Sequence, residues 1–156
     1  MCFRTYEQES GAIIQFLEFN PEIKEECLNL FIESQMLGIK KLKEYGITTK
    51  ILTGDNQYAT ENICNLVGIE DSKILLGTDI DRMPAGELAK KVEEVNVFAR
   101  MNPLQKERII KALRKNGYVV GYMGDGVNHA PSLHNADVGI SVNTATDIAK
   151  EASDII

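Results

Sequence analysis

The stretch Gly121–Ser141, GYMGDGVNHAPSLHNADVGIS, contains two apolar runs separated by a segment rich in glycine and polar residues. The first run ends in the Gly-Asp-Gly triplet centred on Asp125, and the second run starts near Asp137. Glycine has no Cβ, so a backbone flanked by glycines can turn sharply and approach a ligand closely. The stretch therefore predicts two strands of a sheet, with a binding site at the end of the first.

Short apolar runs alternate with helical patterns along the chain, which is typical of a parallel sheet covered by helices. We expect strands near Ala12–Glu18, Thr48–Thr53, Lys73–Leu76, Asn96–Ala99, Tyr118–Met123 and Asp137–Val142. We expect helices near Lys24–Lys43, Gln57–Val67, Pro84–Glu94, Pro103–Lys115 and Thr144–Ser153. The predicted fold class is α/β with a mainly parallel sheet.

Two of these helices have marked ends. Asn102 and Gln105 have the spacing of a capping box around Pro103, and Gly117 follows the last turn of the same helix. Gly68 holds the equivalent place after the helix that starts near residue 57. These signals predict where both helices stop.

Length and composition favour a single domain over residues 1–156. The chain has 17 Lys and Arg against 23 Asp and Glu, a net charge of −6 and no dense basic run, which argues against a nucleic-acid partner. Cys2, Cys27 and Cys64 are widely spaced and contain no C-x-x-C pair, so neither a disulfide framework nor a zinc site is expected. No apolar run approaches the roughly 18 residues of a membrane helix. We expect this chain to be soluble in a reducing cytosol.

Ligands of open parallel sheets bind beyond the carboxyl ends of the strands. At one such end, Thr53 and Gly54 precede a helix, so a hydroxyl, a backbone N–H and the helix N-terminus offer convergent donors for a phosphate. The alternative is an ordinary N-cap turn, in which Asp55 or Asn56 satisfies helix N–H groups. Taken alone, this short motif favours the turn.

Lys106 and Asp125 are the other candidates at this edge. Lys106 lies in the first turn of its helix, where a cation is unfavourable by roughly 0.3–1 kcal/mol, and its side chain leans back toward the strand ends. A solvated surface lysine is the alternative. Asp125 near phosphate donors is a natural ligand for Mg²⁺, which prefers one or two carboxylates with phosphate oxygens and water. A turn-forming aspartate is its alternative.

In chain order, strand-Thr-Gly, Pro-x-x-Lys and strand-Gly-Asp-Gly-x-Asn match the second, third and fourth motifs of the haloacid dehalogenase superfamily. The blocks ILTGDN, VFARMNPLQKERIIKAL, GYMGDGVNHAP, ADVGIS and DIAKEASDII resemble the phosphorylation domain of P-type cation-transporting ATPases, from Gly46 to Ile156. ILLGTDIDRM, ELAKKVEEVNVFAR and GISVNTATDIAKEASDII are most similar to the bacterial magnesium-transporting branch. The resemblance implies a three-layer αβα, Rossmann-like haloacid dehalogenase fold.

The resemblance also implies a chemistry. Such pumps transfer the γ-phosphate of ATP to the aspartate of an Asp-Lys-Thr-Gly-Thr stretch, and hydrolysis of this aspartyl phosphate drives cation movement. The implied site residues are Thr53, Gly54 and Asp55 for the phosphoryl group and nucleotide, Lys106 and Asn128 for phosphate binding, and Asp125 for Mg²⁺. The implied cofactors are ATP and Mg²⁺. The implied partners are the nucleotide-binding, actuator and transmembrane domains of the same pump and the transported cation, and the complete protein would lie at the cytoplasmic face of the cell membrane.

The nucleophile motif Asp-Lys-Thr-Gly-Thr does not occur in the 156 residues. We therefore expect a partial phosphorylation domain that lacks the upstream nucleophile segment and the nucleotide-binding insertion, and that is inactive on its own. Asp79 and Asp81 come after the Thr-Gly motif and are expected on a solvated loop. One alternative is a free-standing phosphatase that uses one of these two carboxylates. Another is a degenerate, non-catalytic regulatory module.

His129 stands where this family carries a second aspartate. An imidazole there removes a negative charge beside Mg²⁺, and a protonated imidazole would repel the ion. We expect weakened metal binding. The alternative is that His129 caps the following turn while Asp125 alone anchors a largely hydrated ion.

Overall fold

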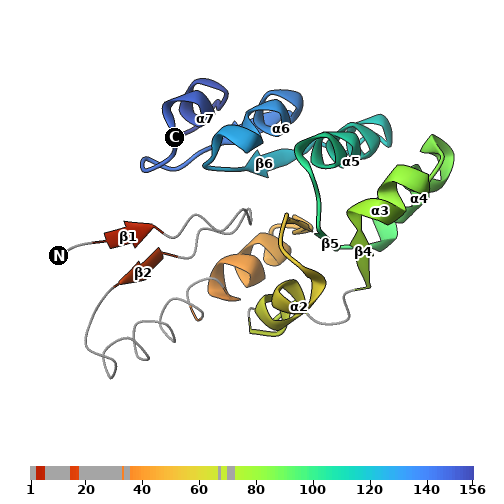
Figure 1. Ribbon diagram of the computed structural model, residues 1–156, viewed down its shortest axis with the longest axis horizontal. Helices are drawn as coiled ribbons and strands as arrows, with labels where there is room; N and C mark the ends of the chain where they lie inside the picture. The colour runs from red at the N-terminus through yellow and green to blue at the C-terminus, as the bar shows by residue number, and fades with distance from the viewer. Residues whose placement is uncertain (1–2, 6–14, 18–32, 34–35, 67, 70–72) are drawn as a thin grey trace.

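The computed structural model describes residues 3–5, 15–17, 33, 36–66, 68–69 and 73–156 (Figure 1). An antiparallel pair, β1 (Phe3–Thr5) and β2 (Gln15–Leu17), comes first, and residues 36–44 are helical. There follow β3 (Ile51–Leu52), α2 (Gln57–Leu66), β4 (Ile74–Leu76), α3 (Gly77–Arg82), α4 (Ala85–Glu94), β5 (Val97–Ala99), α5 (Pro103–Lys115), β6 (Gly121–Met123), η1 (Val127–His129), α6 (Ala130–Asn135), β7 (Val138–Ile140) and α7 (Asp147–Glu151). The predicted α/β class is confirmed.

The later strands pair in parallel in two groups. One has the order β3-β5-β4, with Val97 of β5 opposite both Ile51 and Ile74. The other pairs β6 with β7, with Gly121 opposite Val138. Within the described residues no backbone pairing joins β3 to β6, and each of these two strands has one edge without a partner strand among those residues.

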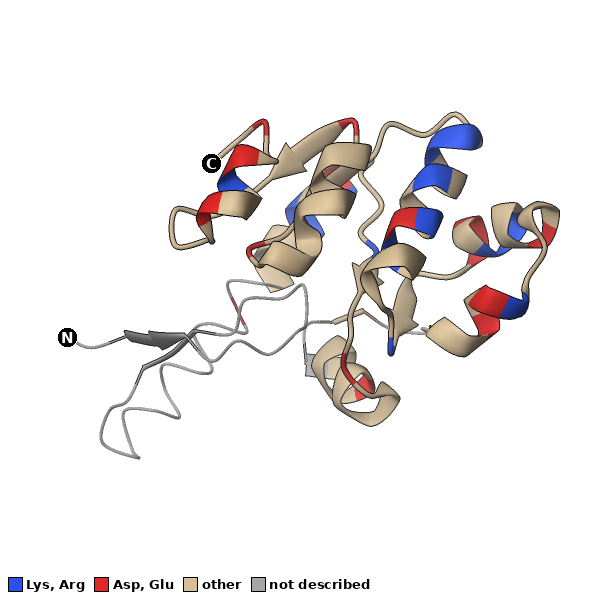
Figure 2. Cartoon of the chain, turned by 45° about the horizontal axis from the view of Figure 1, so that its top comes forward, with Lys and Arg blue, Asp and Glu red and all other residues tan. Residues whose placement is uncertain are grey.

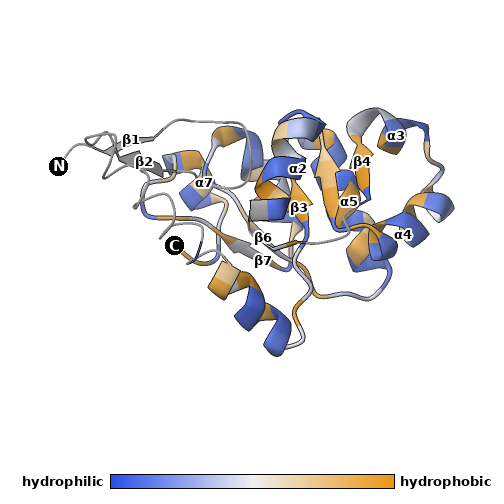
Figure 3. Cartoon of the chain, turned by 90° about the horizontal axis from the view of Figure 1, so that it is seen from below, coloured by the Kyte–Doolittle hydropathy of each residue, from blue (hydrophilic) through white to orange (hydrophobic). Residues whose placement is uncertain are grey.

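Helices lie on both sides of these strands. In Figure 1, α5, α6 and α7 run along the top of the molecule, α2 lies below, and the strands lie between them. Strand β5 is the most deeply buried, since Val97, Phe98 and Ala99 are fully covered. Figure 3 shows β3 and β4 in the colours of apolar residues, as expected for strands covered by helices. The arrangement is the three-layer architecture predicted from the sequence.

Two apolar clusters form the core. The first joins α3, α4, β5 and α5 through Ile80, Leu88, Val92, Val95, Phe98, Met101, Ile109 and Leu113. The second joins α5, β6, α6 and α7 through Ile110, Tyr122, Leu133, Ala145 and Ala149. Leu52 of β3 and Val120, just before β6, contact both clusters, so the two groups of strands share one interior.

The marked helix ends form as predicted. The Asn102 side chain accepts from the Gln105 N–H at 2.9 Å, and the Gln105 side chain accepts from the Asn102 N–H at 2.8 Å. Gly117 has a φ of 90°, in the left-handed region that glycine adopts at low cost, and its N–H donates to the Arg114 carbonyl. Gly68 has a φ of 75°. Both stop signals are confirmed.

The loop expected at Asp79 and Asp81 is wrong, because both residues lie in α3, although Asp81 is exposed as expected. The Asp79 carboxylate accepts from the Leu76 N–H at 3.0 Å, which caps the helix. The Asp81 carboxylate accepts from Gln105 Nε2 at 2.7 Å, and Ile80 is fully buried in the core. Contacts from α5, which is distant in sequence, therefore stabilise this six-residue helix.

Other boundaries differ by a few residues. The hydrophobic pattern does not indicate η1 and α6, the short helices between β6 and β7. Helix α7 is shorter than expected because the Thr146 side chain caps its start. The strand and helix predicted at Ala12–Glu18 and Lys24–Lys43 lie partly outside the described residues.

The helices carry both acidic and basic residues. Figure 2 shows successive basic residues along α5, and acidic residues on α3 and α4. None of the helices in the described part of the chain is both long enough and apolar enough to cross a membrane.

Candidate functional site

Thr53 follows β3 directly and is only 3% exposed. Its N–H donates to the Phe98 carbonyl and its carbonyl accepts from the Met101 N–H, each at 2.9 Å. Its Oγ donates to the Asp55 carboxylate and accepts from the Asp55 N–H, both at 3.1 Å. These contacts fix Thr53 against the end of β5 and join it to Asp55 in a closed turn.

The cap of α2 is Asn56, not Asp55. The Asn56 side chain accepts from the N–H groups of Tyr58 and Ala59 at 3.1 and 3.0 Å. The Asp55 carboxylate is therefore not used to cap the helix and instead holds the Thr53 hydroxyl. A phosphate at this turn would compete with Asp55 for the proton of that hydroxyl.

Arg100 closes the turn after β5 in a strained backbone conformation. Its φ of 53° is the only positive value of a non-glycine residue among those described, and such a conformation costs roughly 1–2 kcal/mol. Its N–H donates to the Asp55 carbonyl at 2.8 Å. Its carbonyl oxygen would lie 2.4 Å from a Cβ at Gly77, the first residue after β4. The ends of β3, β4 and β5 thus meet at this residue.

Lys106 lies in the first turn of α5 and is 3% exposed, so it is not a solvated surface lysine. Its backbone N–H donates to the Asn102 carbonyl. Its ammonium group lies close enough to His129 to lower the pKa of that imidazole. A buried ammonium group requires nearby negative charge or acceptors. Lys106 therefore brings a buried positive charge into the neighbourhood of His129.

Both backbone polar groups of Asp125, its N–H and its carbonyl, form hydrogen bonds. Its N–H donates to His129 Nδ1 at 3.2 Å, and its carbonyl accepts from the N–H and Oγ of Thr146 at 3.0 and 3.3 Å. Its carboxylate Oδ1 lies 3.6 Å from His129 Nδ1, and the side chain is 29% exposed. The carboxylate remains available at the strand end, while the backbone that carries it is fixed.

His129 is buried, with 4% of its surface exposed. Burial lowers its pKa, the Lys106 charge lowers it further, and the Asp125 carboxylate opposes both. Because Nδ1 accepts the Asp125 N–H, the imidazole is neutral with its proton on Nε2. The repulsion expected from a protonated imidazole is therefore disfavoured. Burial also raises the pKa of the neighbouring Tyr122 to about 12, which keeps this phenol neutral.

The remaining predicted residues, Asn128 and Gly54, follow β6 and β3 along the chain. Asn128 is in η1 with an exposed side chain, directly before His129. Gly54 is half-buried between Thr53 and Asp55. The structure thus brings Lys106, Asp125 and His129 together, and it links the Thr53 turn to α5 through the segment at Arg100.

Mg²⁺ fits this site as a hydrated ion. In the described residues no group of three or more His, Cys, Asp or Glu side chains could hold a metal ion. Mg²⁺ commonly binds one or two carboxylates and takes its remaining ligands from water and phosphate. The partly exposed Asp125 carboxylate meets that need, whereas a closed cage of protein ligands does not form here.

Three features of this site were not predicted from the sequence. Thr146, which holds the Asp125 carbonyl, could have been noticed as an N-cap residue before an acidic first turn. No sequence pattern predicts the left-handed backbone of Arg100 or the packing of His129 against Gly124, because both depend on tertiary contacts.

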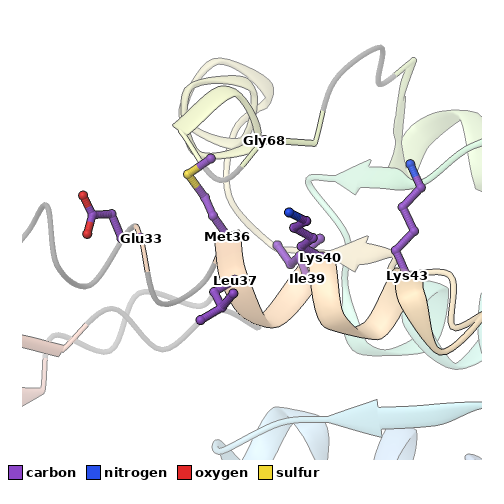
Figure 4. Close-up of a pocket in the computed structure, with 7 residues that line it drawn as sticks. All are labelled: Glu33, Met36, Leu37, Ile39, Lys40, Lys43 and Gly68. Atoms are coloured by element: carbon purple, nitrogen blue, oxygen red, sulfur yellow. The ribbon is translucent and has the colours of Figure 1, made fainter.

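A separate hollow of about 500 Å³ lies beside the helix at residues 36–44 (Figure 4). It is lined by Glu33, Met36, Leu37, Ile39, Lys40, Lys43 and Gly68. In Figure 4 the Met36 side chain points toward Gly68 at the end of α2. No strand-end residue lines this hollow, so it is distinct from the candidate site.

Sequence comparisons place the chain among known proteins. A model of haloacid dehalogenase-like hydrolases matches residues 7–137. The chain is 55% identical over 124 residues to the magnesium-transporting ATPase, P-type 1, of Salmonella typhimurium strain LT2, and 47% identical to that of Escherichia coli K12. It is 43% identical over 121 residues to calcium-transporting ATPase 1 of Bacillus cereus. The first two matches cover 80% of this chain and the third 76%, but the chain spans only 14% of the length of each relative.

A solved structure supports the same relationship. It describes conformational changes in the catalytic domain of the CPx-ATPase CopB-B upon nucleotide binding. The TM-score is 0.54 at 27% identity, over 75% of this chain and 37% of that one. The likeness confirms the predicted αβα fold, and the match over residues 7–137 shows that the chain belongs to the haloacid dehalogenase-like hydrolase family.

Proposed function

We propose that this chain is part of the cytosolic phosphorylation domain of an ATP-driven cation pump that transports magnesium. The observation that carries the proposal is the buried Lys106 beside Asp125 and His129 at the ends of parallel strands. Magnesium is favoured as the cargo because identity is higher to the magnesium-transporting relatives, at 47–55%, than to the calcium-transporting one, at 43%.

Phosphoryl transfer depends mainly on positioning and on neutralising charge. The Thr53 hydroxyl and the Gly54 N–H would donate to the phosphoryl oxygens at the start of α2. Asp55 would release the Thr53 hydroxyl and help to position the nucleotide. Lys106 would offset the phosphate charge, and Asn128 would donate its amide N–H.

Asp125 would hold the catalytic Mg²⁺, which neutralises phosphate charge when bound. The chain's own contribution is to present one carboxylate from a backbone fixed by His129 and Thr146. ATP and Mg²⁺ are the cofactors of the proposed pump.

The proposed nucleophile is an aspartate of another segment of the pump. The open edges of β3 and β6 suit the addition of a strand, and Leu52 and Val120 already join the cores beneath them. Val119, two residues before β6, and Met123, its last residue, are 84% and 54% exposed. A parallel strand added there would end at the same edge as Thr53 and Asp125, so its terminal aspartate would face the phosphate site.

The proposed function implies partner domains and a location in the cell. The nucleotide-binding, actuator and transmembrane domains of the pump would complete the protein, with this domain at the cytoplasmic face of the cell membrane. On its own the chain would bind ligands but not turn over ATP.

The proposal is tested by phosphorylating the complete pump. The full reading frame that encodes this chain is expressed in membranes and incubated with γ-labelled ATP and Mg²⁺. A hydroxylamine-sensitive phosphoenzyme is expected, because aspartyl phosphates react with hydroxylamine. Lys106→Ala should abolish it, whereas Lys111→Ala, an exposed lysine of the same helix, should not. Full labelling of Lys106→Ala would refute the assigned role.

A further inference from the structure

We propose that His129 is a positioning residue that orients the Asp125 carboxylate by accepting the Asp125 N–H on its Nδ1. The inference rests on the proposed role of Asp125 as the Mg²⁺ ligand, and it concerns how this chain holds that ligand in place.

Every backbone polar group of Asp125 is engaged. The N–H donates to His129 Nδ1 at 3.2 Å, and the carbonyl accepts from the Thr146 N–H and Oγ. The His129 N–H in turn donates to the Gly126 carbonyl at 3.0 Å, which closes the turn that returns the imidazole to Asp125. The carboxylate is therefore the polar group of Asp125 left to reach a ligand.

The imidazole is packed against neighbouring residues on two sides. A Cβ at Gly124 would lie 2.5 Å from His129 Nδ1, 2.6 Å from Cβ and 2.7 Å from Cγ, so the ring occupies the space that any larger residue would need. On another side the ring meets Tyr122 edge-on, with centroids 6.0 Å apart and planes at 85°. Because Gly124 has no side chain, it leaves room for the His129 imidazole.

These contacts separate positioning from metal ligation. Nδ1 is 3.6 Å from the Asp125 carboxylate but is already occupied by the Asp125 N–H, so it has no lone pair for an ion. His129 acts on the metal site only through Asp125. An aliphatic side chain of similar size would fill the space but leave the partly buried Asp125 N–H without an acceptor.

The test uses Mn²⁺ as a probe for the Mg²⁺ site in the 156-residue chain, with binding followed by electron paramagnetic resonance. Hydrogen exchange of the Asp125 amide, followed by NMR, gives a second readout. His129→Leu should lower Mn²⁺ affinity about tenfold and expose the Asp125 amide to exchange. His129→Asn, whose Oδ1 can take the place of Nδ1, should retain affinity within about threefold and keep the amide protected. His134→Leu removes the chain's other histidine, which is exposed in α6, and should change neither readout.

Gly124→Ala provides a second route if His129→Leu fails to fold. It displaces the imidazole while keeping it in the chain, so the amide should lose protection and Mn²⁺ affinity should fall. A folded His129→Leu or Gly124→Ala chain with wild-type affinity and wild-type amide protection would overturn the inference. If the wild-type chain bound no Mn²⁺, the metal role of Asp125 would fail, and amide protection alone would decide whether His129 holds the backbone.

Discussion

Lys106 and Asp125 carry opposite charges, and both act on the buried imidazole of His129. Burial and the ammonium group of Lys106 disfavour the charged imidazole, so in the proposed metal site the negative charge beside His129 comes from Asp125. Charge at residue 129 is therefore the variable to which this site should respond most strongly.

His129→Asp should raise Mg²⁺ affinity by about tenfold, because ligand charge count tunes affinity. Without Mg²⁺ the same change should cost about 1–3 kcal/mol of stability, since a buried carboxylate would stand near that of Asp125. Calorimetric titration and thermal unfolding with and without Mg²⁺ measure the two effects. His134→Asp, at the exposed histidine, is the control. Equal affinity in wild type and His129→Asp would contradict the expectation.

Stability should depend on pH through His129. Its pKa is lowered in the fold by burial and by Lys106, so between the folded pKa and the unfolded value of about 6.5 the unfolded chain binds more protons than the native chain. The stabilisation from neutral His129 is thus fully present above about pH 6.5 and is lost as the pH falls through the folded pKa. Urea unfolding from pH 5 to 8 should show a smaller loss in His129→Asn. Parallel curves for the two proteins would rule the effect out.

At the scale of elements, predictability follows from where the stabilising contacts lie. Helix α5 has the predicted bounds, Pro103–Lys115, because its capping box and its stop at Gly117 are local in sequence. Helix α3 could not be predicted, because its six residues are too few to show a period and its partners come from α5. Short apolar runs also predicted where the strands lie, but the predicted strands are longer than the observed ones.

The candidate site also has a part that the sequence predicts and a part that it does not. The positions of Thr53, Lys106 and Asp125 at the strand ends follow from the order of strands and helices, which the sequence pattern reveals. The pairing of Thr53 with Asp55 and of His129 with the Asp125 N–H depends on side-chain packing, which a pattern does not contain. The sequence pattern therefore indicated which residues follow the strand ends, but not the hydrogen bonds that hold them.

Gln105 should be a strong determinant of the α3 to α5 contact. Its side chain accepts from the Asn102 N–H and donates to the Gly77 carbonyl and the Asp81 carboxylate, and it is 6% exposed. Gln105→Ala should cost about 2–4 kcal/mol, because buried partners lose their hydrogen bonds. Lys111→Ala, on the exposed face of α5, should cost less than about 0.5 kcal/mol. Urea unfolding compares them, and equal costs would show that Gln105 is dispensable.

At the scale of the whole molecule, the open edges of β3 and β6 leave the sheet in two parts. A peptide with an apolar run followed by Asp-Lys-Thr-Gly-Thr should bind between them, since unpaired edges accept an added strand. Hydrogen exchange should then slow at Leu52 and Met123, whose N–H groups face the unpaired edges, but not at Phe98 in β5. A scrambled peptide is the control. Exchange unaffected by either peptide would mean that the edges are closed to a strand.

Leu52 and Val120 touch the apolar interior on both sides of that division. Because these two side chains pack against both clusters, unfolding of one half would remove packing contacts from the other. Thermal unfolding should therefore show a single midpoint for both halves. Leu52→Ala would weaken this joint and split the melting curve in two. A domain whose sheet is interrupted can thus remain one cooperative folding unit, because its continuity lies in shared hydrophobic contacts rather than in backbone hydrogen bonds.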